Sequence, residues 1–439
     1  MRMSGGLLAG AAVVSIAPRA EDLAAGVYLG GFGSYRNRRA AGVHDEPWCR
    51  ALALSDGTLT LIVAALDLVG ASGPLLASVR DDASRLMGVA PERIIVCCTH
   101  SHASPDLQGL WGGVPASYRT HVAHRAASAI WEALQALVPV TATAATATLD
   151  GHVRNRRGWP ETDVALTALR FTGAGGWPVA TLVNYACHPT ASGPENSDVS
   201  RDWCGYAVDA VERELGGPAL YVNGAIGDVN PARDGSFEAA EALGAAVARR
   251  TVEALEMATA VGGALDVRMR VLELPLNFER LAQRVQDAVG RAGPALSLLS
   301  RAGGLHGAAR ALHAAGRPDL AQIVAAFEGI SERRLVHRDG KTYLSTHCGY
   351  LRVGGDVEAF CAPGEVLTRL ALPLRASLGA RHRLFLGMAQ DTLGYFLPED
   401  EWMSGRNHNY EESVSTGKHA GTVLADALLS LVRHGEARA

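Results

Sequence analysis

Continuous apolar runs that end in polar residues alternate along this chain with amphipathic stretches, and this alternation limits the fold more than any other feature. The runs at 58–70, 93–102 and 178–188 have the continuous apolar character of strands buried on both faces. The stretches at 72–87 and 203–215 carry apolar residues at helical spacing, with Ser72 as a candidate N-cap. The pattern predicts an α/β fold of mixed β-sheets with flanking helices and a site at the strand ends.

The remaining elements follow from the same signals. Further strands are expected at 7–18, 165–171, 219–225, 351–363 and 383–390, and further helices at 121–137, 237–256, 365–378 and 421–433. Residues 278–334 are rich in Ala, Leu and Arg with glycine breaks, which predicts a helical insertion. Because helix and strand signals lie on both sides of this insertion, we expect one domain over 1–439.

Composition excludes several classes of protein. The 439 residues are 48% apolar and 20% charged, which argues against disorder. The net charge of −4 supplies no basic field for nucleic acid, and no apolar run is long enough to predict a membrane-spanning segment. The seven cysteines form no CxxC pair, so reduced thiols and a cytoplasmic location are expected. A secretory signal at the N-terminus is the alternative, and the oligomeric state stays open.

Two histidine motifs are candidates for chemistry. In THSHASPD (99–106), His100 and His102 are two residues apart at the end of an expected strand, so their side chains would project from the same face. In NYACHP (184–189), the proline stops the ladder at His188. If the two strand ends meet, they supply nitrogen ligands for zinc. The alternative is that these histidines are structural and close turns.

Three other segments have weaker signals. In NGAIGDVNP (223–231), backbone N–H groups could face a developing negative charge, or the segment could be a tight turn. Glu365 opens an expected helix, where a carboxylate is favoured for structural reasons alone. Tyr395 ends a strand-like run and would ordinarily be a packing residue. Motifs for dinucleotides, nucleoside triphosphates, zincins and α/β-hydrolases do not occur at fitting positions.

Taken in order, these segments resemble the catalytic N-terminal domain of the neutral/alkaline ceramidase family, zinc amidohydrolases that cleave the N-acyl bond of a sphingolipid. The segments that carry the resemblance are AGAAVVSIAP with GVYLGGFG (26–33), GVHDEPWCRALAL (42–54), THSHASPD, VRNRRGW (153–159), NYACHPT, NGAIGDVNP, PGE, DTLGY and NYEES (409–413). The resemblance thus extends over nearly the whole chain.

The resemblance implies a site around one zinc ion. The ligands it implies are His100, His188, Glu365 and Tyr395. His102 would handle protons or orient substrate beside the metal, and Arg156 would contact substrate. The residues expected to line the substrate are Gly227, Asp228, Asn230 and Tyr410.

The implied activity is hydrolysis of an amide by a metal-activated water. Asn230 stands where the family carries a serine, which favours attack by water over a serine acyl-enzyme. We expect a small-molecule or lipid-like N-acyl substrate other than ceramide itself. A zinc-dependent esterase or lactonase, a non-catalytic metal-binding homologue, and a metal-free protein with structural histidines are the alternatives.

Overall fold

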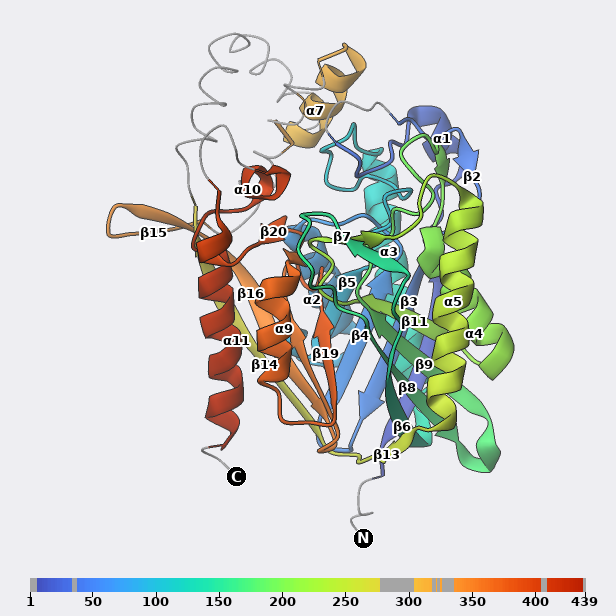
Figure 1. Cartoon of the computed structure of the whole chain (residues 1–439). Helices are drawn as coiled ribbons and strands as arrows, with labels where there is room; N and C mark the ends of the chain where they lie inside the picture. Colours follow the sequence, from blue (N-terminus) through green and yellow to red (C-terminus); the bar gives the residue numbers. More distant parts are fainter. Residues whose placement is uncertain are drawn as a thin grey trace.

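In the computed structural model, two β-sheets pack face to face and helices cover the outer face of each, giving four layers (Figure 1). The structure describes residues 6–33, 38–276, 304–317, 321, 324–325, 335–403 and 409–436. The predicted fold class, α/β with mixed sheets and flanking helices, is confirmed.

The larger sheet contains nine described strands. They are β1 (Leu8–Ser15), β3 (Trp48–Ser55), β4 (Thr60–Leu66), β5 (Ile94–Cys98), β6 (Val138–Thr148), β8 (Ala165–Gly173), β9 (Pro178–Tyr185), β11 (Ala219–Asn223) and β13 (Thr259–Val261). The order across the sheet is β11, β9, β8, β6, β1, β3, β4 and β5, with β13 beside β6. Pairing is antiparallel between β1 and β3 but parallel between β4 and β5, so the sheet is mixed.

The smaller sheet and three short ribbons complete the described β-structure. The smaller sheet consists of β14 (Leu265–Pro275), β15 (Leu335–Arg338), β16 (Lys341–Val353), β17 (Val357–Cys361) and β19 (His382–Leu386). The ribbons are β2 (Gly42–Val43) with β10 (Asp198–Val199), β7 (Val153–Asn155) with β12 (Val229–Pro231), and β18 (Glu365–Val366) with β20 (Tyr395–Phe396).

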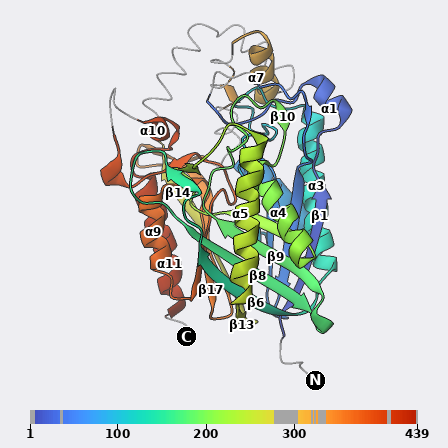
Figure 2. The same cartoon turned by 45° about the vertical axis from the view of Figure 1, so that its right-hand side comes forward.

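Helices pack on the outside of both sheets (Figure 2). The described α-helices are α1 (Ala20–Ala25), α2 (Gly73–Met87), α3 (Ala116–Gln135), α4 (Asp202–Leu215), α5 (Phe237–Glu256), α7 (Gly304–Ala314), α9 (Thr368–Ala376), α10 (Tyr410–Val414) and α11 (Ala420–Glu436). The larger sheet is covered by α2 to α5, and the smaller sheet by α9 and α11. Across the described residues, no helix has the length and apolar character needed to span a bilayer.

Burial on both faces explains the continuous apolar runs. In β3, Leu52 and Leu54 pack toward the smaller sheet, whereas Ala51 and Ala53 pack in the cluster that contains α2 and α3. Successive side chains of a strand point to opposite faces, so a strand between two layers needs apolar residues at every position. Each fully buried leucine contributes about 1.5–3 kcal/mol of hydrophobic stabilisation. The larger side chains point toward the other sheet.

Four predicted elements have clearly different bounds in the structure. The run at 351–363 is a hairpin and not one strand, because the chain turns at Gly354, where φ is +62°. The helix predicted at 365–378 begins at Thr368, and Glu365 lies in β18. The strands predicted to reach His102 and His188 end earlier, at Cys98 and Tyr185. Polar residues at strand ends therefore belong to the loops that follow.

The insertion predicted at 278–334 lies partly outside the described residues. Its described helix, α7, contacts the loop that follows α1, where Arg310 donates to the carbonyls of Gly26 (3.0 Å) and Ala25 (3.1 Å). The division of the chain into one domain with an insertion stays a prediction.

Candidate metal centre

His100 lies two residues beyond β5, where the chain leaves the larger sheet. Its φ of +68° is in the left-handed region, which few residues other than glycine occupy. Its backbone N–H donates to the carbonyl of Leu68 (2.9 Å), and its ring Nδ1 contacts the carbonyl of Val69. A carbonyl can only accept, so this contact assigns the ring proton to Nδ1 and leaves Nε2 with a free lone pair. His100 therefore presents Nε2 as a ligand atom.

His102 converges on the same point, although not by sharing a strand face with His100, because β5 has already ended. Its Nε2 lies 3.2 Å from Nε2 of His100. The backbone N–H of Phe32 donates to Nδ1 of His102 (3.3 Å), which assigns the proton of the neutral ring to Nε2. The two neighbouring rings are thus in opposite tautomers, and His102 faces the centre as a hydrogen-bond donor.

His188 lies three residues beyond β9 and is fully buried. Its backbone N–H donates to the carbonyl of Val229 (2.8 Å), and its carbonyl accepts from the indole of Trp203 (3.2 Å). Neither nitrogen of its ring has a hydrogen-bond partner among the described residues. Buried polar atoms are rarely left unpaired, so a buried ring whose only close polar neighbour among the described residues is the Glu365 carboxylate at Nε2 is a candidate for binding a ligand.

The Glu365 carboxylate lies between His100 and His188, the two histidines available to bind a metal ion. Its Oε1 lies 3.5 Å from Nε2 of His100, and its Oε2 lies 3.0 Å from Nε2 of His188. Burial opposes ionisation of Glu365, but the neighbouring histidines and Arg156 outweigh burial and lower the pKa of the carboxyl to about 2. Burial lowers the pKa of His100 to about 4. An ionised carboxylate and a neutral imidazole are the forms that bind a metal ion.

Tyr395 reaches the site through backbone pairing. In the parallel ribbon of β18 and β20, it lies directly opposite Glu365. Its side chain is buried, which raises the pKa of the phenol well above its usual value, although Arg156 acts in the opposite direction. The guanidinium of Arg156 lies 5.0 Å from the centre of the Tyr395 ring. The ring of Tyr410 lies 5.8 Å from this ring, measured between centroids, and Tyr410 is half exposed.

Arg156 is tied to the glycine loop that follows β11. Its backbone N–H donates to the carbonyl of Asp228 (2.8 Å), and its guanidinium donates to the carbonyl of Gly227 (2.7 Å). Gly227 is packed so closely that a Cβ there would lie 2.8–2.9 Å from Val366 and Leu367. A glycine is needed here for close approach to the residues that follow Glu365.

The other two predicted residues of the loop differ in what they contact. The Asp228 carboxylate is buried and accepts hydrogen bonds from the backbone and hydroxyl of Thr368 (2.8 and 2.7 Å) and from the amide of Asn155 (2.7 Å). These contacts join the loop to the start of α9. Asn230 is partly buried in β12, and its side-chain oxygen has no hydrogen-bond partner among the described residues. Asn230 is therefore the more available of the two for a ligand.

This cluster can hold a metal ion. One ring nitrogen from each of His100, His102 and His188 lies within 4.8 Å of the others. The tautomers distinguish His100 from His102, because Nε2 of His100 has no proton whereas Nε2 of His102 carries one. Nε2 of His188 and Oε2 of Glu365 lie 3.0 Å apart in the same cluster. Imidazole nitrogens with a carboxylate are a donor set that suits zinc.

Sequence reasoning gave no role to the loop that closes over His102. Gly31 has φ of +78°, and a Cβ at this residue would lie 2.3 Å from the His102 ring. The Phe32 ring contacts the same imidazole edge to face, with centroids 4.9 Å apart. The pair of glycines before Phe32 was the available signal, because two adjacent glycines often mark close backbone approach.

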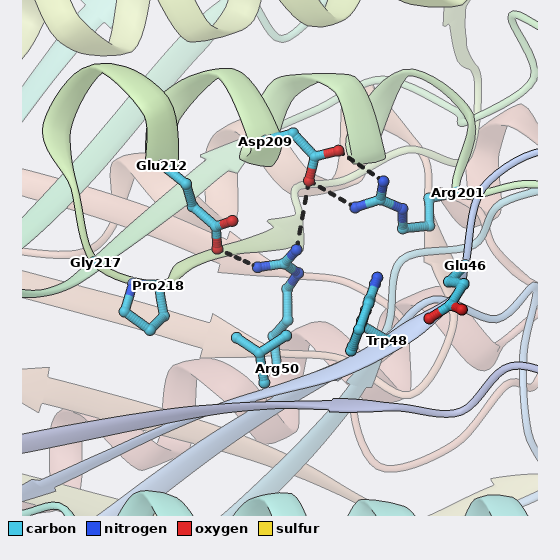
Figure 3. A pocket seen from close by; sticks show the side chains of 9 residues that line it. Glu46, Trp48, Arg50, Arg201, Asp209, Glu212, Gly217 and Pro218 are labelled. Carbon is cyan, nitrogen blue, oxygen red and sulfur yellow. Dashed lines mark hydrogen bonds and ion pairs between the residues drawn. The ribbon is translucent and has the colours of Figure 1, made fainter.

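An open pocket of about 600 Å³ lies away from this cluster, between β3 and α4 (Figure 3). Its charged residues pair with one another: Arg201 with Asp209 at 2.7 Å, and Arg50 with Glu212. The pair of Arg50 and Glu212 joins β3 to α4, whereas Arg201 directly precedes α4 and pairs with a residue of that helix. The pocket therefore contains a structural ion network, and the chemically equipped site is the histidine cluster.

The class of protein with this fold is known from solved structures. The chain matches no protein-family model and no curated protein sequence. Its fold is that of the neutral ceramidases.

One match is the crystal structure of neutral ceramidase from Pseudomonas aeruginosa, with 18% identity and a TM-score of 0.74 over 98% of this chain and 74% of that chain. Another is a ceramidase complexed with C2, with 16% identity and a TM-score of 0.75 over 99% of this chain and 76% of that chain. Identities this low establish a shared fold, in agreement with the predicted resemblance.

Proposed function

We propose that this protein is a zinc-dependent amidohydrolase that cleaves an N-acyl amide bond with water. The observation that carries the proposal is the meeting of His100, His188 and Glu365 in one buried cluster. The resemblance of the sequence and the shared fold with ceramidases support the same reaction class. Tyr395 completes the proposed set of zinc ligands.

The residues around the cluster suit amide hydrolysis. A zinc ion held by this set would supply positive charge and would lower the pKa of a water molecule toward neutral pH. Arg156 remains charged, because the phenol of Tyr395 and the carboxylates of Glu411 and Glu365 outweigh the burial that opposes its charge and raise its pKa. Its guanidinium can donate to the oxyanion that develops on the carbonyl. The Nε2 proton of His102 makes this ring a second donor, so we assign His102 to orienting the carbonyl.

The glycine loop would contact the rest of the substrate. Asn230 has an unpaired side-chain oxygen that can accept a hydrogen bond from an N–H or O–H group. Asn230 has no hydroxyl, so the attacking group in this proposal is water. We propose an N-acyl compound, either a small molecule or lipid-like, as the substrate class and expect ceramide itself to be a poor substrate.

The test combines metal analysis with a substrate panel. The purified protein is loaded with zinc, its metal content is measured, and X-ray anomalous scattering at the zinc edge locates the ion. Hydrolysis is assayed on N-acyl amines of increasing chain length and on the matching esters, with H188A as the metal-site control. We expect one zinc per chain and faster turnover of amides. Zinc near zero after loading contradicts the metal site, and a zinc-bound protein inactive on every compound would be a non-catalytic homologue.

A further inference from the structure

Two adjacent buried glutamates on α10 contact two adjacent arginines that follow β7. Glu411 and Glu412 are only 4% and 3% exposed. Glu411 lies 2.9 Å from Nε of Arg156 and 3.1 Å from the guanidinium of Arg157. Glu412 lies 3.1 Å from Arg157. The two glutamates thus have similar burial and charge and both contact Arg157, but only Glu411 contacts Arg156.

The two arginines face different surroundings. The Arg156 guanidinium donates to the carbonyl of Gly227 (2.7 Å) and lies over the ring of Tyr395, so it belongs to the candidate site. The Arg157 guanidinium lies 4.9 Å from the ring centre of Trp159, in a cluster that also contains Arg369. An ion pair at Arg157 therefore stabilises local packing, whereas an ion pair at Arg156 acts on the site.

A guanidinium is planar, so contacts at two of its edges fix the direction of its remaining N–H donors. The Gly227 carbonyl accepts a hydrogen bond from one terminal nitrogen, and the Glu411 carboxylate forms an ion pair with Nε at 2.9 Å without hydrogen-bond geometry. Without the carboxylate, the long Arg156 side chain could rotate about its axis while keeping its charge. A change at Glu411 can therefore alter the orientation of the Arg156 guanidinium without removing its charge.

We propose that Glu411 is a positioning residue that orients Arg156 toward the reacting carbonyl, and that Glu412 has no such role. The inference rests on the proposed amide hydrolysis, in which Arg156 acts on charge that develops in the transition state. A misdirected donor affects that charge more than it affects ground-state binding, so kcat should fall while KM stays nearly constant.

The first experiment compares E411Q with E412Q in the zinc-loaded full chain. With the most rapidly hydrolysed N-acyl amine of the panel, we expect E411Q to lower kcat by about 10- to 100-fold with KM within about 3-fold. E412Q should keep kcat within about 3-fold of the wild type, since packing alone changes. Zinc content should be unchanged in both. Equal losses in the two variants, or no loss in E411Q, overturn the proposal.

The second experiment is a double-mutant cycle with R156A. If Glu411 acts through Arg156, then E411Q has no further effect on kcat in the R156A background, whereas independent effects would multiply. Thermal unfolding of each variant reports any loss of folding. If E411Q does not fold, E411D replaces it, and the shorter carboxylate should give a smaller loss of kcat in the same direction.

The third experiment keeps this inference distinct from the proposed function. Crystal structures of zinc-loaded wild type, E411Q and E412Q show where the Arg156 guanidinium lies. We expect it to leave the face of Tyr395 in E411Q alone. A displaced guanidinium in a protein that hydrolyses no amide would contradict the proposed function and support the positioning role. An active wild type with an unmoved guanidinium in E411Q would contradict the positioning role.

Discussion

At the scale of single residues, the histidines differ in which ring nitrogen holds the proton. The carbonyl of Val69 selects one tautomer of His100, and the backbone N–H of Phe32 selects the other tautomer of His102. A histidine that binds a metal through Nε2 usually donates its Nδ1–H to a carbonyl or carboxylate, as His100 does. We therefore expect His100 to bind the metal ion and His102 to act as a hydrogen-bond donor.

The first prediction compares the three histidines. H100A and H188A should lose both zinc and activity, because each removes a nitrogen with a free lone pair. H102A should keep zinc within about 3-fold of the wild-type affinity and lose rate, since it removes a donor and not a ligand. Metal content and turnover measured on the same samples check this. Loss of zinc in H102A equal to that in H100A would make His102 a ligand.

The second prediction concerns the charge of Glu365. E365Q keeps the size of the side chain but removes the negative charge between His100 and His188. Mutation of a carboxylate that only hydrogen-bonds to a metal ligand lowers metal affinity by about 10- to 100-fold. Loss of the Glu365 carboxylate, a proposed direct ligand, should lower zinc affinity at least as much. Zinc competition with a chelator measures the affinity. Wild-type affinity in E365Q would leave Glu365 with a structural role.

The sequence could identify some site residues and not others, for physical reasons. His100 and His188 were found because each follows a long apolar run and stands close to a proline. Glu365 and Tyr395 lie in strands of two residues, which are too short for any periodicity. They entered the prediction through the family resemblance alone. The contacts of Val69 and Phe32 depend on loop conformation, which no local pattern encodes.

At the scale of elements, helices were predicted better than strands. The helix at 237–256 has the predicted bounds, because its amphipathic pattern extends over its whole length. β6 was missed, since its alternating threonines and alanines give a weak apolar signal. The hairpin at Gly354 was missed because apolar residues flank it on both sides, although Gly354, Gly355 and Asp356 between them are a turn signal.

The third prediction tests the loop that closes over His102. Gly31 and Gly33 both have left-handed φ, +78° and +74°, but a Cβ would collide with His102 only from Gly31. G31A should therefore displace the His102 ring and lower turnover by about 10-fold or more, with zinc retained. G33A carries similar backbone strain without the collision and serves as the control. Similar turnover in the two variants would mean that the position of His102 does not matter.

At the scale of the whole molecule, stability should depend on pH through the buried carboxyl group of Asp67, which interacts with Arg201 and Arg50 of the ion network in Figure 3. Asp67 follows β4 and is 4% exposed. Burial raises the pKa of Asp67 to about 6, although Arg201 and Arg50 act in the opposite direction. The folded state thus holds a proton that the unfolded state releases near pH 4. The stabilisation from this proton is complete below pH 4 and is lost as the pH rises through 6.

The fourth prediction follows from this direction of the pH dependence of stability. D67N keeps an oxygen that can accept the backbone N–H of Trp48 (3.0 Å in the wild type) and removes the buried charge. At pH 7.5 it should raise the free energy of unfolding by up to about 3 kcal/mol, and at pH 4 the gain should vanish. Denaturant unfolding at both pH values measures this. D81N, on the exposed face of α2, should change stability by less than about 0.5 kcal/mol at either pH. A gain in D67N that does not depend on pH would contradict the assignment.

The proposed zinc ligands come from both halves of the sandwich. His100 and His188 follow strands of the larger sheet, whereas Glu365 and Tyr395 follow β17 and β19 of the smaller one. With these four residues as ligands, the set would be complete only after residue 395 has been synthesised, so zinc bound by all four would join late in folding. Zinc affinity would then depend on how the two sheets pack against each other. A distant mutation that shifts one sheet relative to the other would first be detected as a lower affinity for zinc.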